Sequence, residues 1–241
     1  MADIEIKKGK GTMNLPASKL PVPPERHDFR SSFHWRVFRI MAEFIDGWTF
    51  LADFKKIVTF FGSARFQEGY RWYEEARTLA KLLGEAEYGV ITGGGPGIME
   101  AGNRGVSEGG GDSIGLNIQL PYEQRINPWV RKGIGFHYFF VRKVMLSYAA
   151  QVYVYFPGGF GTLDEFFELV TLIQTKKIST KIPIICVGKE FWDPLTGWIR
   201  DQMYEKFKAI DKEDQEIYQI VDSAQEAFAI IKASPERTEF G

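Results

Sequence analysis

The sequence predicts an α/β protein, namely a Rossmann-like, doubly wound parallel sheet in a single domain with an N-terminal helical extension. Three observations predict this class. From residue 57 onward, short apolar runs alternate with helical stretches, which is the pattern of βαβ units. Several of the runs are apolar at every position, as strands buried on both faces must be. Finally, three glycine-bearing turns each follow a run and lead into a helix.

The expected strands are the short runs rich in β-branched and aromatic residues. They cover residues 57–61, 88–91, 112–118, 135–140, 152–156, 182–187 and 217–221. The segments between them are helical in pattern, and Pro96 stands where a first-turn proline belongs. These segments predict helices over 70–83, 96–108, 141–149, 162–177, 194–207 and 223–232.

The chain divides into an arm, a helix, a main domain and a tail. The division is an arm over 1–30, a helix over 31–55, the main domain over 56–233 and a tail over 234–241. Lysines, glycines and a proline cluster make the arm typical of a flexible segment. Ser31 or Ser32 is the expected N-cap of the helix.

The N-terminal helix carries large apolar residues at helical spacing. They are Phe33, Val37, Ile40, Met41, Phe44, Ile45, Trp48 and Leu51. A stripe that aromatic should not face water. We therefore expect it to pack against the main domain and against a symmetry-related copy, which gives a homodimer.

The composition excludes several classes of function. The net charge is −1, so we expect no nucleic-acid partner, and any anion site must be local. The single cysteine, Cys186, stands in an apolar run, and the histidines show no metal-ligand spacing, so we expect neither a disulfide nor a metal. No apolar stretch reaches about 18 residues, so no membrane span is expected. The N-terminus lacks an apolar signal core, which indicates the cytoplasm.

The three glycine turns lie at the edge of the sheet where parallel α/β proteins bind ligands. Glycine lets the backbone approach a ligand closely, and the following helix start favours an anion. Because neither the Walker pattern nor the dinucleotide fingerprint is present, we expect the phosphate of a small nucleotide, held most strongly by residues 157–162. The candidate binding residues are Gly62, Ser63, Gly94, Gly95, Gly158, Gly159, Gly161 and Thr162.

Glu165 has two interpretations, and the pattern alone leaves both open. Thr162 and Glu165 match the capping box, in which the two side chains bond to each other's backbone N–H groups. Alternatively, Glu165 lies one turn inside a helix that holds a phosphate, where a carboxylate can stabilise a cationic sugar or activate water. Arg142 and Lys143 are the candidate cations, because a pair at a helix start is slightly unfavourable without a function.

Three further polar residues are weaker candidates for ligand contact. Arg65 follows the first turn, and Glu123 and Gln124 follow a proline after the third strand. No cofactor is expected, because the backbone N–H groups and the helix dipole are sufficient to hold a phosphate.

Two segments together carry a family resemblance. Gly93 to Ala101 (GGGPGIMEA) and Pro157 to Glu165 (PGGFGTLDE) resemble the LONELY GUY (LOG) family, whose members are often labelled possible lysine decarboxylases. The resemblance covers about 57–187. It implies a Rossmann-like dimer that cleaves the N-glycosidic bond of cytokinin riboside 5′-monophosphates and, in some members, of AMP. It also implies that Arg142 and Glu165 are catalytic and that Lys143 contributes to binding.

The sequence departs from the plant-like members in two ways. It has the N-terminal extension, and it has Glu100 where those members usually have glycine, which bears on the preferred base. The decarboxylase label has no support, because that chemistry needs a Schiff-base lysine and the glycine turns contain none.

Two alternatives to the enzyme stay open. Molybdenum-cofactor carriers resemble the same family and hold a phosphate-bearing pterin without chemistry. A nucleotide-sensing interaction protein that uses the N-terminal arm is the third possibility.

Overall fold

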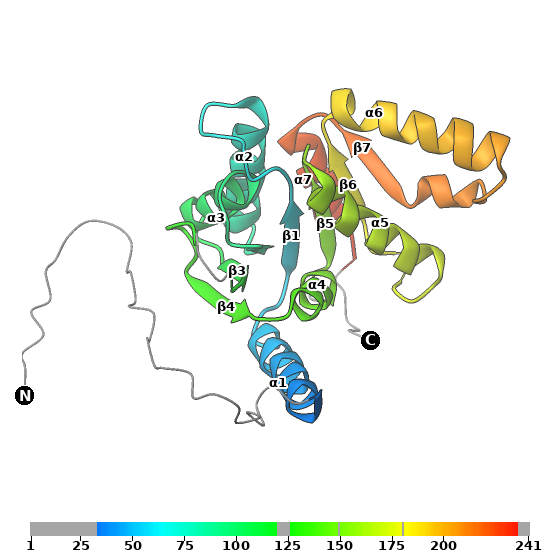
Figure 1. The fold of residues 1–241 in the computed structure, drawn as a ribbon. Helices are drawn as coiled ribbons and strands as arrows, with labels where there is room; N and C mark the ends of the chain where they lie inside the picture. Colours follow the sequence, from blue (N-terminus) through cyan, green and yellow to red (C-terminus); the bar gives the residue numbers. More distant parts are fainter. Residues whose placement is uncertain (1–32, 120–125, 149, 180, 236–241) are drawn as a thin grey trace, which may run out of the picture. The chain divides into compact units, whose positions relative to one another are not determined.

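The computed structural model describes residues 33–119, 126–148, 150–179 and 181–235 (Figure 1). These residues form a sheet with the order β4-β3-β2-β1-β5-β6-β7, in which all neighbouring strands are parallel. Its strands are β1 (Ile57–Phe61), β2 (Gly89–Thr92), β3 (Ser113–Ile118), β4 (Lys132–Phe136), β5 (Val152–Tyr155), β6 (Ile184–Val187) and β7 (Tyr218–Val221). The chain winds outward from β1 in one direction and then from β5 in the other, which confirms the doubly wound α/β class.

The helices precede the sheet or connect its strands. They are α1 (Phe33–Leu51), α2 (Arg71–Glu85), α3 (Ile98–Glu108), α4 (Phe139–Tyr148), α5 (Phe160–Gln174), α6 (Lys189–Trp198) and α7 (Ala224–Ala233). A π-helical segment, η2 (Ile199–Lys206), continues α6, and a short 3₁₀ turn, η3 (Glu213–Glu216), precedes β7.

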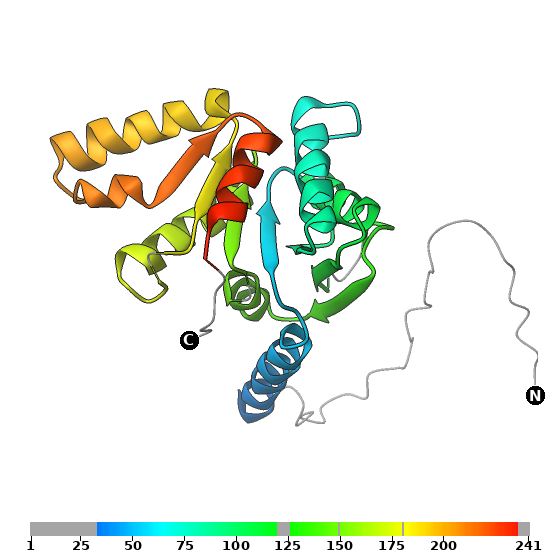
Figure 2. The ribbon, with the colours of Figure 1, turned by 180° about the vertical axis from the view of Figure 1, so that it is seen from behind.

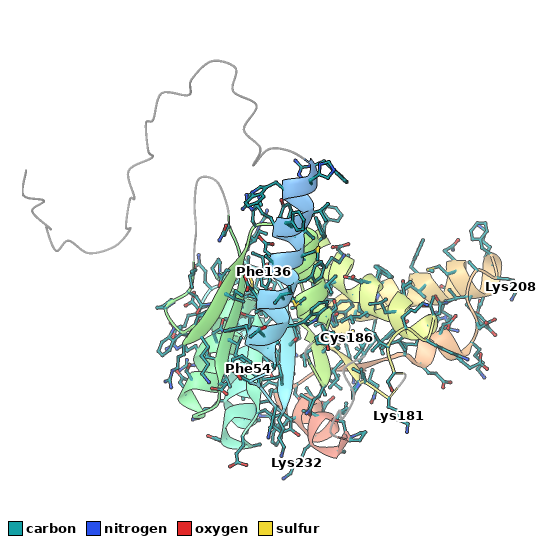
Figure 3. All side chains as sticks on the ribbon, turned by 90° about the horizontal axis from the view of Figure 1, so that it is seen from below. Phe54, Phe136, Lys181, Cys186, Lys208 and Lys232 are labelled. Carbon is teal, nitrogen blue, oxygen red and sulfur yellow. The ribbon has the colours of Figure 1, made fainter. Side chains whose placement is uncertain are left out.

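Two hydrophobic cores lie on the two faces of the sheet. In β1, Ile57 and Phe61 belong to the core with α4 and α5, whereas Val58 and Phe60 belong to the core with α2, α3 and α7. Figure 2 shows α7 in front of the strands on this second face. Because helices cover both faces, β1, β2, β5 and β6 are buried at every position, which explains their continuous apolar sequences. Cys186 in β6 is fully buried (Figure 3).

The first helix is apolar on two sides. Ile40, Phe44 and Leu51 pack against the core, and Gly47 lies against Phe136, which Figure 3 shows beside α1. The expectation that the apolar stripe is buried in the domain is therefore confirmed for these residues. Met41, Ile45 and Trp48 are 52%, 59% and 43% exposed in the single chain. The expectation that this outward side packs against a symmetry-related copy stays a prediction.

Some element boundaries differ from those expected. The edge strand β4 covers Lys132–Phe136 rather than 135–140, and it is exposed at three of its five positions. A strand at the edge does not need an apolar sequence, so the aromatic run after it misled the prediction, and that run begins α4 instead. Helix α6 begins at Lys189 rather than near residue 194, because Asp222 accepts the Lys189 N–H at 3.1 Å and Gly188 turns the chain with φ +106°.

Several features predicted from the sequence lie outside the described residues and stay predictions. They are the arm over 1–30, the caps Ser31 and Ser32, and the weak candidates Glu123 and Gln124. In the part of the chain that the structure describes, no helix is long and apolar enough to cross a membrane.

Candidate active site

A cleft of about 880 Å³ opens at the carboxyl ends of β1, β2, β5 and β6. Segments 60–66 after β1 and 157–162 after β5 form its floor. These two strands are neighbours, but the chain leaves them in opposite directions across the sheet. Such a switch point is where open α/β sheets bind ligands, because the loops diverge and leave a crevice between them.

The turn after β5 presents the N-terminus of α5 to the cleft. The helix begins at Phe160, two residues earlier than expected, with Gly159 as its N-cap and no side-chain cap. The first N–H groups of a helix have no intrahelical partner, so this turn offers free donors and the positive end of the helix dipole. Gly158, Gly159, Gly161 and Thr162 all line the cleft. The arrangement suits an anion such as a phosphate.

Gly158 must be glycine for a steric reason. A Cβ atom at this position would lie 2.1 Å from Thr162 Oγ1. The Thr162 side chain, which is only 6% exposed, therefore folds back against the turn and fixes its shape. By contrast, a Cβ at Gly159 or Gly161 would meet no protein atom within 4 Å.

The turn after β1 is hydrogen-bonded directly to the turn after β5. Ser63 N–H donates to Pro157 O at 3.0 Å, and Ser63 O accepts from Ile98 N–H at 3.0 Å, at the first residue of α3. Gly62 packs tightly against Ile98, where a Cβ would approach within 2.6 Å. Gly62 and Ser63 thus line the cleft, and they also hold α3 and the β5 turn together.

The glycine turn after β2 reaches the cleft through Gly93 alone of its three glycines. Gly94 has φ +72°, its N–H donates to Thr92 Oγ1, and its carbonyl accepts from Asn127 N–H. The carbonyl of Gly95 accepts from Asn127 Nδ2 at 2.9 Å. The structure therefore does not place Gly94 and Gly95 on the cleft wall, which corrects that expectation. Their carbonyls serve to anchor the loop at residue 127.

Arg142 enters the cleft from α4. Its Nε donates to Leu116 O at 2.8 Å, and its Nη2 lies against Gly93, where a Cβ would approach within 2.5 Å. Burial lowers the pKa of the guanidinium, and the charge of Glu165 opposes this by raising it. The group keeps its charge, because an arginine pKa far above neutrality tolerates such a change. Arg142 is thus a held, partly desolvated cation.

Glu165 enters from the second turn of α5 and is only 7% exposed. Burial and then Glu168 raise its pKa to about 7, while Lys143 and Arg142 lower it. Among the described residues, Glu165 Oε2 has no hydrogen-bond partner. The capping-box interpretation is wrong, because the N-cap is Gly159 and Thr162 lies within the first turn. The fold therefore buries one oxygen of this carboxylate without giving it a hydrogen bond from the described residues.

Lys143 is the neighbour of Arg142 but does not line the cleft. Its Nζ lies 2.6 Å from Asp164 Oδ2 and 3.2 Å from Glu168 Oε2, both on α5. The two cations of α4 thus have different neighbours. Arg142 reaches the cleft, whereas Lys143 joins α4 to α5, so the structure gives no support to Lys143 as a substrate contact.

The cleft has apolar walls that sequence reasoning did not identify. Met99, Phe139 and Leu146 lie on the side of Arg142, and Tyr70 and Phe191 lie on the other side. Phe139 and Tyr70 are 58% and 49% exposed, which is unusual for large apolar residues. The three consecutive aromatic residues Tyr138 to Phe140, shortly before Arg142, were the available signal for Phe139. The weak candidate Arg65 also lines the cleft.

Glu100, at the position where the sequence departs from plant-like members, does not line the cleft. Its Oε1 accepts a hydrogen bond from Tyr73 Oη at 3.3 Å, which joins α3 to α2. A direct contact of Glu100 with a base in this cleft is therefore not supported.

The family model described as "Possible lysine decarboxylase" matches residues 99–231. The cytokinin riboside 5′-monophosphate phosphoribohydrolase LOG of Oryza sativa subsp. japonica is 30% identical over 66% of this chain and 65% of its own length. The probable phosphoribohydrolase LOG6 of Arabidopsis thaliana is 29% identical over 50% of this chain and 61% of its own. The matched part of the chain thus spans less than two thirds of the length of these relatives.

Solved structures share the fold. The structural genomics target TM1055 superposes with a TM-score of 0.56 at 26% identity, over 73% of this chain and 98% of its own. The molybdenum cofactor binding protein of Rippkaea orientalis gives a TM-score of 0.56 at 18% identity, over 74% and 96% of the two chains. The molybdenum cofactor carrier protein of Chlamydomonas reinhardtii gives 0.56 at 21%, over the same shares. At such identities the last two show the fold alone.

Proposed function

The chain belongs to the LOG family, whose family model is described as possible lysine decarboxylase, and from this premise we propose that it is a nucleoside 5′-monophosphate phosphoribohydrolase. It hydrolyses the N-glycosidic bond of AMP or of a cytokinin riboside monophosphate. The products are the free base and ribose 5-phosphate. The observation that supports this most is the buried side chain of Glu165, whose Oε2 has no hydrogen-bond partner among the described residues, beside a helix start that suits a phosphate.

The phosphate binds at the start of α5 in this proposal. Backbone N–H groups near Gly159 to Thr162 donate to its oxygens, and the helix dipole adds to the attraction. Charge-assisted hydrogen bonds of this kind are about twice as strong as neutral ones. The phosphate thereby fixes the sugar one turn further along α5, beside Glu165.

Glu165 stabilises the positive charge that develops on the sugar as the bond to the base breaks, and it positions the attacking water. A carboxylate with a pKa of about 7 is well matched to accept a proton from that water near neutral pH. Arg142, held by Leu116 O, orients the substrate and favours the ionised form of Glu165. Met99, Phe139 and Leu146 offer apolar contact to the planar base.

The decarboxylase label fits the site poorly. Pyridoxal phosphate chemistry needs a lysine that forms an imine at the reacting centre. Among the described residues that line the cleft there is no lysine, and the nearby Lys143 is paired with two carboxylates.

The assay that tests the proposal is incubation of the purified protein with AMP and with N6-modified AMP analogues, followed by chromatographic detection of free base. We expect base and ribose 5-phosphate in equal amounts. If the protein binds monophosphates tightly but releases no base from any of them, the proposal is wrong, and a carrier of a phosphate-bearing ligand becomes the better interpretation. Removal of residues 1–28 tests the third possibility, because nucleotide binding that persists without the arm would count against a sensor that uses it.

We also propose that the protein is a homodimer, located in the cytoplasm, that pairs through the outward side of α1 and the adjoining side of α4. This surface consists of Phe38, Met41, Ile45, Trp48, Phe140 and Val144, each more than one third exposed. Helices α1 and α4 lie in contact, because Gly47 packs on Met145 and the rings of Trp48 and Tyr148 lie 6.0 Å apart. Their exposed apolar residues therefore form one surface. Monomers rarely leave such an apolar patch exposed, and two-fold pairing buries it on both copies at once.

A further inference from the structure

Three side chains form an ionic bridge between α4 and α5. Asp164 lines the cleft, whereas Lys143 and Glu168 do not. Lys143 extends from α4, with its Nζ 2.6 Å from Asp164 and 3.2 Å from Glu168. The two carboxylates lie one helical turn apart, on either side of Glu165 in the sequence. The side chains of Lys143 and Glu168 are 20% and 26% exposed, so solvent screens this pair less than an open surface pair.

We propose that Lys143 is a positioning residue of the proposed reaction: by bridging Asp164 and Glu168 it fixes α4 against α5 and offsets the two negative charges that flank the carboxylate of Glu165. This inference rests on the proposed role of Glu165. It assigns Lys143 a function through its neighbours rather than through contact with the nucleotide.

The geometry separates the two adjacent cations of α4. Arg142 Nε is held by Leu116 O in the cleft, and Lys143 Nζ is held by α5 on the other side of the helix. A rotation or shift of α4 would break both attachments together. The bridge therefore keeps Arg142 in place opposite Glu165, which no contact within α4 itself can do.

The charge balance around Glu165 depends on the bridge. The charged groups that act on it are Arg142 and Lys143 from α4 and Asp164 and Glu168 from α5, so its surroundings are neutral only while Lys143 is present. From the strand side, Tyr155 donates its Oη to the main-chain oxygen of Glu165, and its phenol stays protonated because burial raises its pKa. Glu168 Oε2 has no hydrogen-bond partner among the described residues. Its ion pair with Lys143 Nζ, at 3.2 Å, is therefore the interaction that offsets the negative charge of this oxygen.

The direction in which each substitution shifts the pKa of Glu165 follows from the sign of the charge that it removes. Loss of Lys143 leaves one uncompensated negative charge beside Glu165, because Arg142 alone then faces Asp164 and Glu168, and this should raise the pKa of Glu165. Loss of the Glu168 charge should lower it. Loss of both should return it close to the wild-type value. A nearby charge typically moves a carboxyl pKa by about one unit or more.

The test is a pH titration of the Glu165 carboxyl by ¹³C NMR without substrate, in the full chain labelled at glutamate side chains and assigned with Glu165→Gln. We compare wild type with Lys143→Met, Glu168→Gln and the double variant. Lys143→Arg serves as the charge-conserving variant. Lys132→Met is the matched control, because it removes a 2.9 Å ion pair to Asp112 at the opposite edge of the sheet.

We expect the Glu165 midpoint to rise by about one pH unit in Lys143→Met, to fall in Glu168→Gln, and to stay unchanged in the double variant, Lys143→Arg and Lys132→Met. With AMP as substrate, kcat/KM of Lys143→Met should fall about fivefold at pH 7 and recover by about pH 9. An unchanged midpoint in Lys143→Met, or in Glu168→Gln if the lysine variant does not fold, overturns the proposal. The titration of Glu165 needs no turnover. A wild-type protein that shows no activity would therefore refute the proposed function, while the effect of Lys143 on the Glu165 midpoint could still be measured.

Discussion

Arg142 and Glu165 enter the same cleft from different helices, and each favours the charged form of the other. Arg142 lowers the pKa of Glu165, while Glu165 raises that of Arg142, although burial acts in the opposite direction on both. The result is a carboxylate whose pKa is about 7 rather than one that is permanently ionised or permanently neutral. Perturbed groups of this kind in a cleft are typical of catalytic sites.

The first prediction concerns pH. If ionised Glu165 is the active form, kcat/KM with AMP should rise as the pH increases through about 7 and level off above it. The midpoint should appear in kcat/KM, which reports the free enzyme, measured between pH 5 and 9. A profile that is flat over this range would contradict the assignment of Glu165 as the group that must lose a proton.

The second prediction concerns the phosphate. Adenosine lacks the group that the α5 start is proposed to hold, so its kcat/KM should fall by on the order of a hundredfold or more relative to AMP. This corresponds to the loss of two charge-assisted hydrogen bonds at roughly 1.5–3 kcal/mol each. Parallel assays of free adenine from the two substrates give the ratio. Equal turnover of adenosine and AMP would mean that the start of α5 does not bind the phosphate.

The third prediction separates two glycines of the same turn. Gly158→Ala places a Cβ 2.1 Å from Thr162 Oγ1, so the turn must deform. We expect a loss of about 1–3 kcal/mol in the free energy of unfolding, because overpacking costs this much in a tight site. Gly161→Ala is the matched control, since its Cβ meets nothing within 4 Å and alanine suits a helix. Urea unfolding of both variants measures the difference, and equal stabilities would refute it.

The fourth prediction concerns assembly. Ile45→Glu puts a charge in the middle of the exposed α1–α4 surface without disturbing the inward side of the helix. We expect wild type to sediment as a dimer at micromolar concentration and the variant as a monomer, because an unpaired charge would be desolvated at the interface. Phe207→Glu is the control, since Phe207 is equally exposed but lies at the end of η2. A monomeric wild type would refute the dimer.

The fold was predictable because its signals are local. The continuous apolar runs of β1, β5 and β6 follow directly from burial on both faces, and Gly159 to Thr162 lie at a strand end that the sequence identifies. The Arg142–Glu165 pair was inferred from a family resemblance. Periodicity alone does not indicate that two helices meet at one cleft, because the order of strands in a parallel sheet is a long-range property.

The sequence-based predictions were wrong where residues far away in the sequence determine how a side chain or a turn is placed. Gly93, Gly94 and Gly95 are indistinguishable in the sequence, and Asn127, more than thirty positions later, determines which of them faces the cleft. Likewise, Arg142 and Lys143 are adjacent cations, and only the position of α5 separates their roles. The capping-box prediction was wrong because Gly159, not Thr162, is the N-cap. A glycine N-cap lets the helix begin without a hydrogen bond from a capping side chain.

The last prediction uses Glu165→Gln to measure catalysis and stability in one protein. Glutamine keeps the shape but removes the charge, so kcat should fall roughly a hundred- to a thousandfold with little change in nucleotide affinity, as expected for about 2.7–4 kcal/mol of lost transition-state stabilisation. The folded-state pKa is raised from 4.5 to about 7, so the native protein binds an extra proton in this window. Wild-type stability should therefore decline as the pH rises from about 4.5 to about 7.

Glutamine does not titrate, so the variant should escape this decline. Relative to wild type, it should gain about 3 kcal/mol in the free energy of unfolding at pH 8 and little at pH 5, since each pKa unit corresponds to about 1.4 kcal/mol. Urea unfolding at the two pH values measures the gain, and chromatography of free adenine measures the rate. A variant that is slower but not more stable at pH 8 would mean that the carboxylate is already solvated in the native state. A variant that is more stable and still releases adenine at the wild-type rate would mean that Glu165 is buried without being catalytic.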